Sequence, residues 1–371
     1  MKSTITGTNT TMTSNIKKSL IALSIVSVLS ACTATTNDTE ASTGQVNNNT
    51  ITITEANFAQ SETARMYRNW IAGGKANEQF AILPKLPPRG NKAPTVQMND
   101  DTLYGIAIIN AVDGKVTFDI PKTNNYFSVQ VVTENGHGEY LVVEDGVHTL
   151  PVTNTATTFL IYRSGIEMGA NTDEGIANAV AQLKKVDTTK FNFATDYTLP
   201  NYDFAEVDAE VNKRKADVDT IVARDGVFTY TFPRTPAEVT DLTQWNLENA
   251  AGWGGASPVP LEGNKYVNSP YISGETCKTT TFEDPKNRFF TSITAYDSAK
   301  YLIEGAKAIN SYSWEVNADK TVTVSFNCGD DAINNIDTSA YGKDFTITTR
   351  HYGATQAVID SKFDIIIKAI K

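Results

Sequence analysis

Tyr126-Phe-Ser-Val-Gln-Val-Val132 is the stretch that decides the fold class. It is rich in β-branched and aromatic residues, which favour strands. Val116-Thr-Phe-Asp-Ile120 alternates apolar and polar residues between Gly114 and Pro121, and Thr158 to Tyr162 is a second β-branched and aromatic run. Alternation with a period of two is typical of a strand that has one buried face. We therefore expect an antiparallel β region between these residues.

Helical and strand-like patterns extend outward from this region in separate blocks. Ranges with helical spacing of apolar residues are 55–70, 173–186 and 205–224, and Thr235-Pro-Ala-Glu238 has the form of a capping box that opens a helix running to Ala251. Strand patterns return after Pro258, at 289–296, 313–316, 321–326 and 345–352, with a hairpin turn at 317–320, while 358–370 suits a strand or a helix. Strands segregated from helices predict an α+β, mainly β fold with antiparallel β-sandwich domains rather than a βαβ fold.

The N-terminal segment has the pattern of an export signal. Lys17 and Lys18 precede the uncharged, mostly apolar run Ser19–Ala31, which at 13 residues is too short for the roughly 20 that a membrane span needs. Leu29-Ser-Ala-Cys32 resembles a bacterial lipoprotein lipobox, which implies a lipid on Cys32. Thr33 follows the cysteine where an aspartate would signal inner-membrane retention, so the resemblance favours the outer membrane of the cell envelope.

Charge restricts the partners of the chain. The 371 residues carry a net charge of −10, and three lysines but no acidic residue lie before Cys32, so the mature charge would be −13. An acidic surface argues against nucleic-acid binding and against a peripheral grip on anionic lipid. We therefore expect the protein to be attached to the membrane only through the lipid on Cys32. We also expect a ligand that is not strongly anionic, unless a local basic pocket is hidden in the average.

Two cysteines remain once Cys32 is assigned to the lipid. Cys277 and Cys328 would lie in an oxidising compartment, which favours a disulfide, although two buried thiols are the alternative. Neither has a Cys or His neighbour at ligand spacing, so we expect no metal there. We also expect no cofactor.

Asn99-Asp100-Asp101-Thr-Leu-Tyr104 is the densest polar patch. Adjacent carboxylates point to opposite sides of an extended chain, so Asp100 and Asp101 do not form an acid/base pair by themselves. Asn and Asp often bond their own backbone in turns, so the patch forms a turn or cap at a strand entry, or else contacts a ligand through Asn99, Asp101 and Tyr104.

Glu134-Asn-Gly-His137-Gly-Glu139 is the second patch, and with Asp101 it supplies the acid/base candidates. His137 and Glu139 share a side if the chain is extended there, as two metal ligands would, but the glycines equally favour a hairpin tip. Trp253, within Gly252-Trp-Gly-Gly255, could face a sugar ring or be buried at a domain junction. Arg350 is a further ligand-binding candidate.

These motifs, taken together, resemble the paired families DUF1254 and DUF1214. Asn99–Tyr104, Ile120-Pro121, the strand from Tyr126 and the Ile161-Tyr-Arg-Ser-Gly165 turn are similar to DUF1254, while the 289–297 strand, the 318–320 turn and Arg350-His-Tyr352 are similar to DUF1214. The resemblance implies two jelly-roll-like β-sandwich domains joined by a helical segment. The expected organisation is a signal peptide at 1–31, a tether at 32–50, a DUF1254-like domain at 51–190, a helical connector at 191–257 and a DUF1214-like domain at 258–371.

Function is less constrained than fold. The chain has no G-x-S-x-G, no H-E-x-x-H and no phosphate-cradling glycine loop. The first hypothesis is a lipid-anchored envelope protein that binds a glycan or small molecule. The alternatives are an envelope hydrolase or lyase that uses Asp101, Glu134, His137 and Glu139, and a structural or assembly role.

Overall fold

The computed structural model describes residues 50–93, 96–166, 172–217, 220, 232–253, 263–361 and 364–371. The predicted signal peptide, Cys32 and the tether up to residue 49 lie outside these ranges. Within them, no helix combines the length and the apolar character that crossing a membrane requires.

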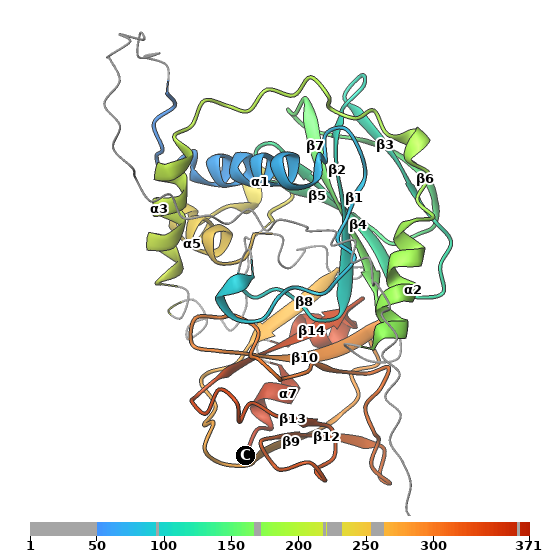
Figure 1. Cartoon of the computed structure of the whole chain (residues 1–371), viewed down its shortest axis with the longest axis vertical. Helices are drawn as coiled ribbons and strands as arrows, with labels where there is room; N and C mark the ends of the chain where they lie inside the picture. Colours follow the sequence, from blue (N-terminus) through green and yellow to red (C-terminus); the bar gives the residue numbers. More distant parts are fainter. Residues whose placement is uncertain are drawn as a thin grey trace, which may run out of the picture. The chain divides into compact units, whose positions relative to one another are not determined.

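The first β region consists of two antiparallel sheets that face each other (Figure 1). The larger has the strand order β1-β2-β7-β4-β5, and the smaller pairs β3 with β6. The strands are β1 (Ala81–Ile82), β2 (Thr102–Asn110), β3 (Lys115–Ile120), β4 (Phe127–Thr133), β5 (Gly138–Val142), β6 (Gly146–Pro151) and β7 (Thr157–Gly165). The strand at 126–132 that the sequence predicts is therefore an interior strand of the larger sheet.

The larger sheet is buried on both faces. On one face, Phe127, Val129 and Val131 of β4 pack with residues of β2, β3 and β7 into a core that the helix α2 (Asp173–Leu183) also covers. On the other, Ile106 of β2 and Phe159 of β7 pack with α1 (Phe58–Gly74). This second face is the one that carries the pocket described below.

Three helices gather on that second side of the sheet (Figure 1). They are α1, α3 (Phe204–Lys215) and α5 (Leu242–Gly252), which share a small core around Phe58, Val207 and Ala250. Asp203 caps α3 by accepting hydrogen bonds from the backbone N–H groups of its first turn. The described chain also has single 3₁₀ turns at Gly90–Lys92, Thr188–Lys190 and Pro236–Glu238.

The second β region is a pair of sheets with an apolar core between them. One has the order β11-β10-β14-β8 and the other β13-β12-β9, and the core includes Ile293, Val324, Phe326 and Ile347. The strands are β8 (Asn264–Asn268), β9 (Lys278–Glu283), β10 (Phe290–Tyr296), β11 (Ile309–Asn310), β12 (Thr321–Phe326), β13 (Asn335–Ile336) and β14 (Thr346–Tyr352). Both regions consist chiefly of antiparallel strands with accompanying helices, which confirms the predicted α+β, mainly β class.

Residues on the pair β10–β14 alternate between two environments. Ser292 lies opposite Arg350, and Thr291 lies opposite His351. Directly opposed residues of an antiparallel pair project from the same face, and neighbours along a strand project from opposite faces. Arg350 therefore faces the first β region, whereas His351 faces the other side, toward the segment that enters α7 (Ile365–Lys368).

The two β regions contact each other through an aromatic cluster. Tyr126 of the first region packs edge-on against Phe289 and Phe290, with ring centroids 5.0 and 5.7 Å away, and its ring lies 5.0 Å from that of Tyr352. The predicted domain boundaries near residues 190 and 258 stay predictions.

Several local predictions are wrong. Thr235 makes no side-chain cap and opens only a 3₁₀ turn: the Glu238 N–H donates to the Thr235 carbonyl, and the Glu238 carboxylate accepts from the Arg234 N–H. Asp241 provides the cap for α5 by accepting from the Gln244 N–H at 2.9 Å. Residues 313–316 form no strand beyond an isolated bridge at Val316. The ambiguous segment after residue 355 contains two short helices, α6 (Gln356–Asp360) and α7.

Cys277 and Cys328 form a disulfide, as predicted, with their Cα atoms 4.5 Å apart. The bond joins the segment before β9 to the segment after β12, and these two strands are neighbours in the three-stranded sheet. It closes a sequence separation of 51 residues within the second β region.

Candidate functional site

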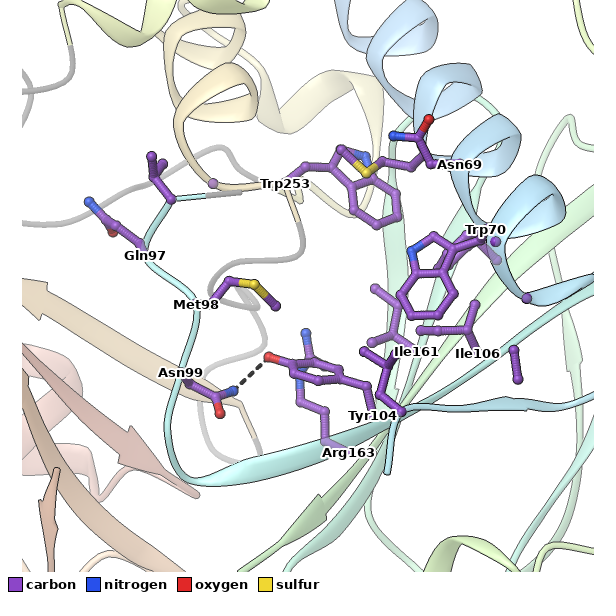
Figure 2. Close-up of a pocket in the computed structure, with 18 of the residues that line it drawn as sticks. Asn69, Trp70, Gln97, Met98, Asn99, Tyr104, Ile106, Ile161, Arg163 and Trp253 are labelled. Carbon is purple, nitrogen blue, oxygen red and sulfur yellow. Dashed lines mark hydrogen bonds between the residues drawn. The ribbon is translucent and has the colours of Figure 1, made fainter. Parts of the chain in front are cut away.

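A pocket of about 430 Å³ opens between the helices, the larger sheet of the first region and the strands β8 and β14 of the second. Figure 2 shows the side chains of α1, β2 and β7 on one side of it and the 97–99 segment on the other. The residues that line it are Met66, Asn69, Trp70, Gly73, Gly74, Ala81, Ile82, Leu83, Val96, Gln97, Met98, Asn99, Tyr104, Ile106, Phe159, Ile161, Arg163, Gly252, Trp253, Tyr266, Asn268 and Arg350.

One end of the pocket is apolar and aromatic. Trp253 packs edge-on against Phe159 at a centroid distance of 5.1 Å, and Trp70 meets the same ring at 6.4 Å. The indole N–H of Trp253 donates to Thr63 Oγ1 at 3.2 Å, which fixes the ring where α5 ends. Trp253 is partly buried between elements and also forms a wall of the cavity, while its predicted contact with a sugar ring stays a prediction.

Arg163 lies at the other, polar end of the pocket. It is fully buried on β7, and its Nη2 donates to Gln130 Oε1 on the neighbouring strand at 2.9 Å. Its register partner on β2 is Tyr104, whose ring centroid lies 5.9 Å from the guanidinium carbon. Asn99 Nδ2 donates to the Tyr104 hydroxyl at 2.6 Å, so the tyrosine is held between the arginine and the 97–99 segment (Figure 2).

Arg350 reaches the same end from the second β region. Its guanidinium donates to Thr294 Oγ1 at 3.1 Å, to the Gln97 carbonyl at 2.9 Å and to the Tyr296 hydroxyl. Burial alone would lower the pKa of Arg350, but the neighbouring tyrosines and Asp101 raise it, so the side chain stays charged. Its Nε–H has no hydrogen-bond partner among the described residues.

Gln97 has a backbone conformation that explains how its carbonyl reaches Arg350. Its φ is +54°, a left-handed value that a non-glycine residue rarely adopts. The Gln97 N–H donates to the Lys300 carbonyl at 2.8 Å, and the Gln97 carbonyl accepts from Arg350. Strained residues of this kind cluster at ligand sites, where the surrounding structure over-determines them.

Asp101 interacts electrostatically with Arg350 and is not one of the residues that line the pocket. It is fully buried, and the Ser292 hydroxyl donates to its Oδ2 at 2.5 Å across the two β regions. Burial raises the pKa of Asp101 to about 6, against the lowering effects of the Arg350 charge and the Ser292 hydrogen bond. Asp101 therefore places a titratable negative charge near the guanidinium.

The rest of the first polar patch forms the predicted turn. Asn99 Oδ1 accepts from the backbone N–H groups of Asp101 and Thr102, both at 3.0 Å. Asp100 is buried and pairs with Arg89 at 2.7 Å. Asn99 and Tyr104 also line the pocket, so for these two residues the turn and the ligand-facing role coincide.

Glu134, His137 and Glu139 do not join this site. Glu134 accepts from the N–H groups of Ala156 and Thr157, and Glu139 accepts from that of Thr153. None of the three lines the pocket. These carboxylates have backbone partners within the first β region.

His137 lies at the tip between β4 and β5, as the hairpin alternative predicted. It stacks on Trp245 at 5.3 Å, and its Nδ1 lies 3.1 Å from the Pro233 carbonyl. Burial lowers its pKa. Among the described residues, His, Cys, Asp and Glu side chains form no group able to hold a metal ion.

Sequence reasoning missed Trp70, Tyr266 and Arg163 as pocket residues. Arg163 was assigned only to a turn that resembled the family pattern. The available signal was its place in the strand-like run from Thr158, where a charged residue follows Ile161 and Tyr162. Continued alternation would have put Arg163 on the same face as Ile161.

The fold and the pocket define a mainly β protein with an internal, small-molecule-sized site. Residues 77–189 match the sequence model of the family described as "Protein of unknown function (DUF1254)", which confirms that part of the resemblance. Arg163 lies inside the matched segment and Arg350 lies outside it. No curated protein matches this chain.

Solved structures of two bacterial proteins are similar to this chain. The VPA0106 protein from Vibrio parahaemolyticus is 13% identical with a TM-score of 0.53, over 85% of this chain and 98% of that protein. A putative uncharacterized protein from Burkholderia cenocepacia is 14% identical with a TM-score of 0.43, over 80% and 84% of the respective chains. At this identity, the first likeness supports the fold alone.

Proposed function

We propose that this chain is a lipid-anchored cell-envelope protein whose two β regions together bind a small organic molecule in the pocket. The observation that carries the proposal is the pocket itself. Its volume of about 430 Å³ falls in the range of roughly 300–1,000 Å³ that is typical of small-molecule sites. Apolar and aromatic walls with a few convergent polar groups are the usual composition of such sites.

A small molecule fits the pocket better than a glycan chain does. A sugar polymer presents many hydroxyl groups along an extended chain, whereas the aromatic end of this pocket consists of Trp70, Phe159 and Trp253 packed on one another. A sugar ring can stack its C–H face on one indole, but the further hydroxyls of a chain would face these apolar walls without hydrogen-bond partners, which is costly. We therefore favour the small-molecule form of the hypothesis over the glycan form.

The hydrolase or lyase alternative has less support. None of its four acid/base candidates lines the pocket, and of the four only Asp101 interacts with a lining residue that is charged, Arg350. Glu134, His137 and Glu139 make other contacts, so among the described residues no acid is paired with a base at the cavity.

The envelope part of the proposal is supported by Leu29-Ser-Ala-Cys32 and by the cysteine pair, since disulfides persist in oxidising compartments. The likeness of the 258–371 region to DUF1214 belongs to the same proposal.

Metabolic labelling with a clickable fatty acid tests the lipid anchor. We expect a labelled protein in the outer-membrane fraction and an unlabelled Cys32→Ser variant, whereas an unlabelled native chain would contradict lipidation.

Ligand binding is tested by screening hydrophobic small molecules and envelope glycans against the full-length protein. Trp70 and Trp253 line the cavity, so occupation of the pocket should change intrinsic tryptophan fluorescence. We expect small molecules to shift both the emission and the melting temperature. If only glycans do so, the small-molecule proposal fails.

A further inference from the structure

We propose that the pocket is a site for a hydrophobic monocarboxylate, with the carboxylate at the Arg163–Arg350 end and the apolar body at the Trp70–Trp253 end. This inference rests on the proposed function and names the class of ligand. It concerns binding alone and involves no chemical change in the ligand.

The two arginines converge on one end of the cavity from different β regions. Arg163 lies over the ring of Tyr104 at 5.9 Å, and Arg350 lies over that of Tyr266 at 5.2 Å. Both guanidinium charges act on Tyr104, so both are close to the same side chain. All four residues line the pocket.

Guanidinium groups are well suited to this role. Their planar fork of N–H donors matches the two oxygens of a carboxylate, and the resulting hydrogen bonds are charge-assisted. Both charged side chains in the described lining are arginines, so the lining itself brings no negative charge that would repel such a ligand. The Arg350 Nε–H is buried and has no hydrogen-bond partner among the described residues, which leaves a donor at this end of the pocket.

Charge balance favours a ligand with a single negative charge. Asp101 is buried near Arg350 and offsets one of the two cations when it is ionised. Asp100 is already paired with Arg89. The polar end therefore carries a net charge of about +1, which a monocarboxylate neutralises and a phosphate dianion would exceed.

The opposite end suits an apolar body. Trp70, Trp253, Ile106 and Ile161 line it, and Figure 2 shows the two indole rings on the side of the cavity away from Met98 and Asn99. A ligand with one anionic end and one apolar end would match this division of the walls. A uniformly polar ligand would leave the tryptophan end poorly filled.

The test compares matched probes by isothermal titration calorimetry on the full-length protein in lipid nanodiscs at pH 7. The probes are 2-naphthoate, its neutral isostere 2-naphthamide, and 2-naphthyl phosphate, with empty nanodiscs as the blank. We expect naphthoate to bind at least tenfold more tightly than either of the others. Equal binding of the amide, or tighter binding of the phosphate, would overturn the inference while the proposed small-molecule function stands.

Variants link the preference to the two arginines. Arg163→Gln and Arg350→Gln should each reduce the naphthoate-to-naphthamide affinity ratio at least fivefold. Amide binding should stay within about twofold, which also shows that the variant is folded. Arg68→Gln is the matched control, because Arg68 is an α1 arginine that contacts Phe204 and does not line the pocket.

The variants also overturn the inference if the ratio stays unchanged in both. If neither probe binds the native protein and hydrophobic probes of other shapes also fail, the proposed function falls and the inference falls with it. That outcome differs from equal binding of naphthamide and naphthoate, which would overturn the inference and leave the proposed small-molecule function standing.

Discussion

Arg350 and His351 are adjacent on β14, yet they lie in opposite environments. His351 Nε2 lies 2.6 Å from Asp364 Oδ2, and Asn287 Nδ2 lies 2.9 Å from His351 Nδ1. Arg350 donates to neutral oxygens of Thr294, Gln97 and Tyr296.

The difference separates a stabilising polar cluster from a binding group. The His351 cluster pairs its carboxylate within the protein, and the bond from His351 keeps the pKa of Asp364 low although burial would raise it. The Arg350 cation lies beside a cavity, and all the oxygens to which it donates hydrogen bonds are uncharged. A buried cation arranged in this way is expected to contribute more to ligand recognition than to folding.

Removing His351 should give the largest effect on stability. His351→Ala leaves Asp364 buried without its charge-assisted partner, and breaking a buried pair costs about 3–5 kcal/mol. Urea unfolding measures the loss, and naphthoate affinity of the folded variant should stay within twofold. A loss below about 1 kcal/mol would show that the His351 cluster does not stabilise the fold.

The disulfide should rank next. Paired Cys277→Ser and Cys328→Ser substitutions release a loop of 51 residues, and closure of such a loop is worth about 4 kcal/mol in the chain-entropy description. Calorimetric unfolding with and without reductant measures this. The bond lies in the second region among residues that do not line the pocket, so ligand affinity should not change. A parallel loss of affinity would show that the pocket depends on this loop.

Arg350→Met should destabilise the protein by only about 1–2 kcal/mol. Methionine fills a similar volume, and the buried Asp101, whose pKa burial raises to about 6, can take up a proton when the cation is removed, so no unpaired charge is left behind. The same variant should lose the preference for the carboxylate probe. If Arg350→Met destabilises as strongly as His351→Ala, the contrast between the two residues is removed.

The smallest expected effect is the pH dependence of carboxylate binding. Burial raises the pKa of Asp101 to about 6. Its carboxylate accepts a hydrogen bond from Ser292 and interacts electrostatically with Arg350, Asp100, Tyr296 and Tyr352. As the pH falls from 7 to 5.5, protonation of Asp101 removes the negative charge beside Arg350. Naphthoate, which remains ionised, should then bind about threefold more tightly.

Asp101→Asn is the control for this pH effect, and it should abolish the dependence. The raised pKa of Asp101 also makes the stability of the protein depend on pH. The folded pKa of about 6 lies above the ordinary aspartate value of 3.8, so the contribution of Asp101 to stability is present below pH 3.8 and is lost as the pH rises through about 6. Asn at this position should therefore flatten the stability profile between those values. An unchanged naphthoate profile in the variant would assign the pH effect to another group.

Much of the fold could be predicted from local patterns, whereas the pocket could not. The strand at 126–132 follows from residue types, and the Cys277–Cys328 pair was expected from the predicted oxidising compartment. The nine-residue strand β2 was anticipated only as a strand entry after the Asn99–Tyr104 turn, because its run contains Gly105 and Ala107, residue types that are depleted in strands. The start of α5 was misplaced because Thr235 and Asp241 both have cap-forming side chains, and tertiary packing selects the second.

The pocket depends on pairings that are distant in sequence. Tyr104 and Arg163 meet only through the register of β2 with β7, and Arg350 comes from a separate sheet. The net charge of −10 conceals the two buried arginines, because the acidic residues dominate the average. The two arginines of the described pocket lining are a local basic group of this kind, while the expectation that the ligand is not strongly anionic stays a prediction.

The most direct test of the central claim is a crystal structure of the protein with 2-naphthoate bound. We predict that the carboxylate lies within hydrogen-bond distance of the Arg163 and Arg350 guanidinium groups and that the ring lies against Trp70 and Trp253. A naphthoate bound elsewhere, or one whose carboxylate points to the tryptophan end, would contradict the account.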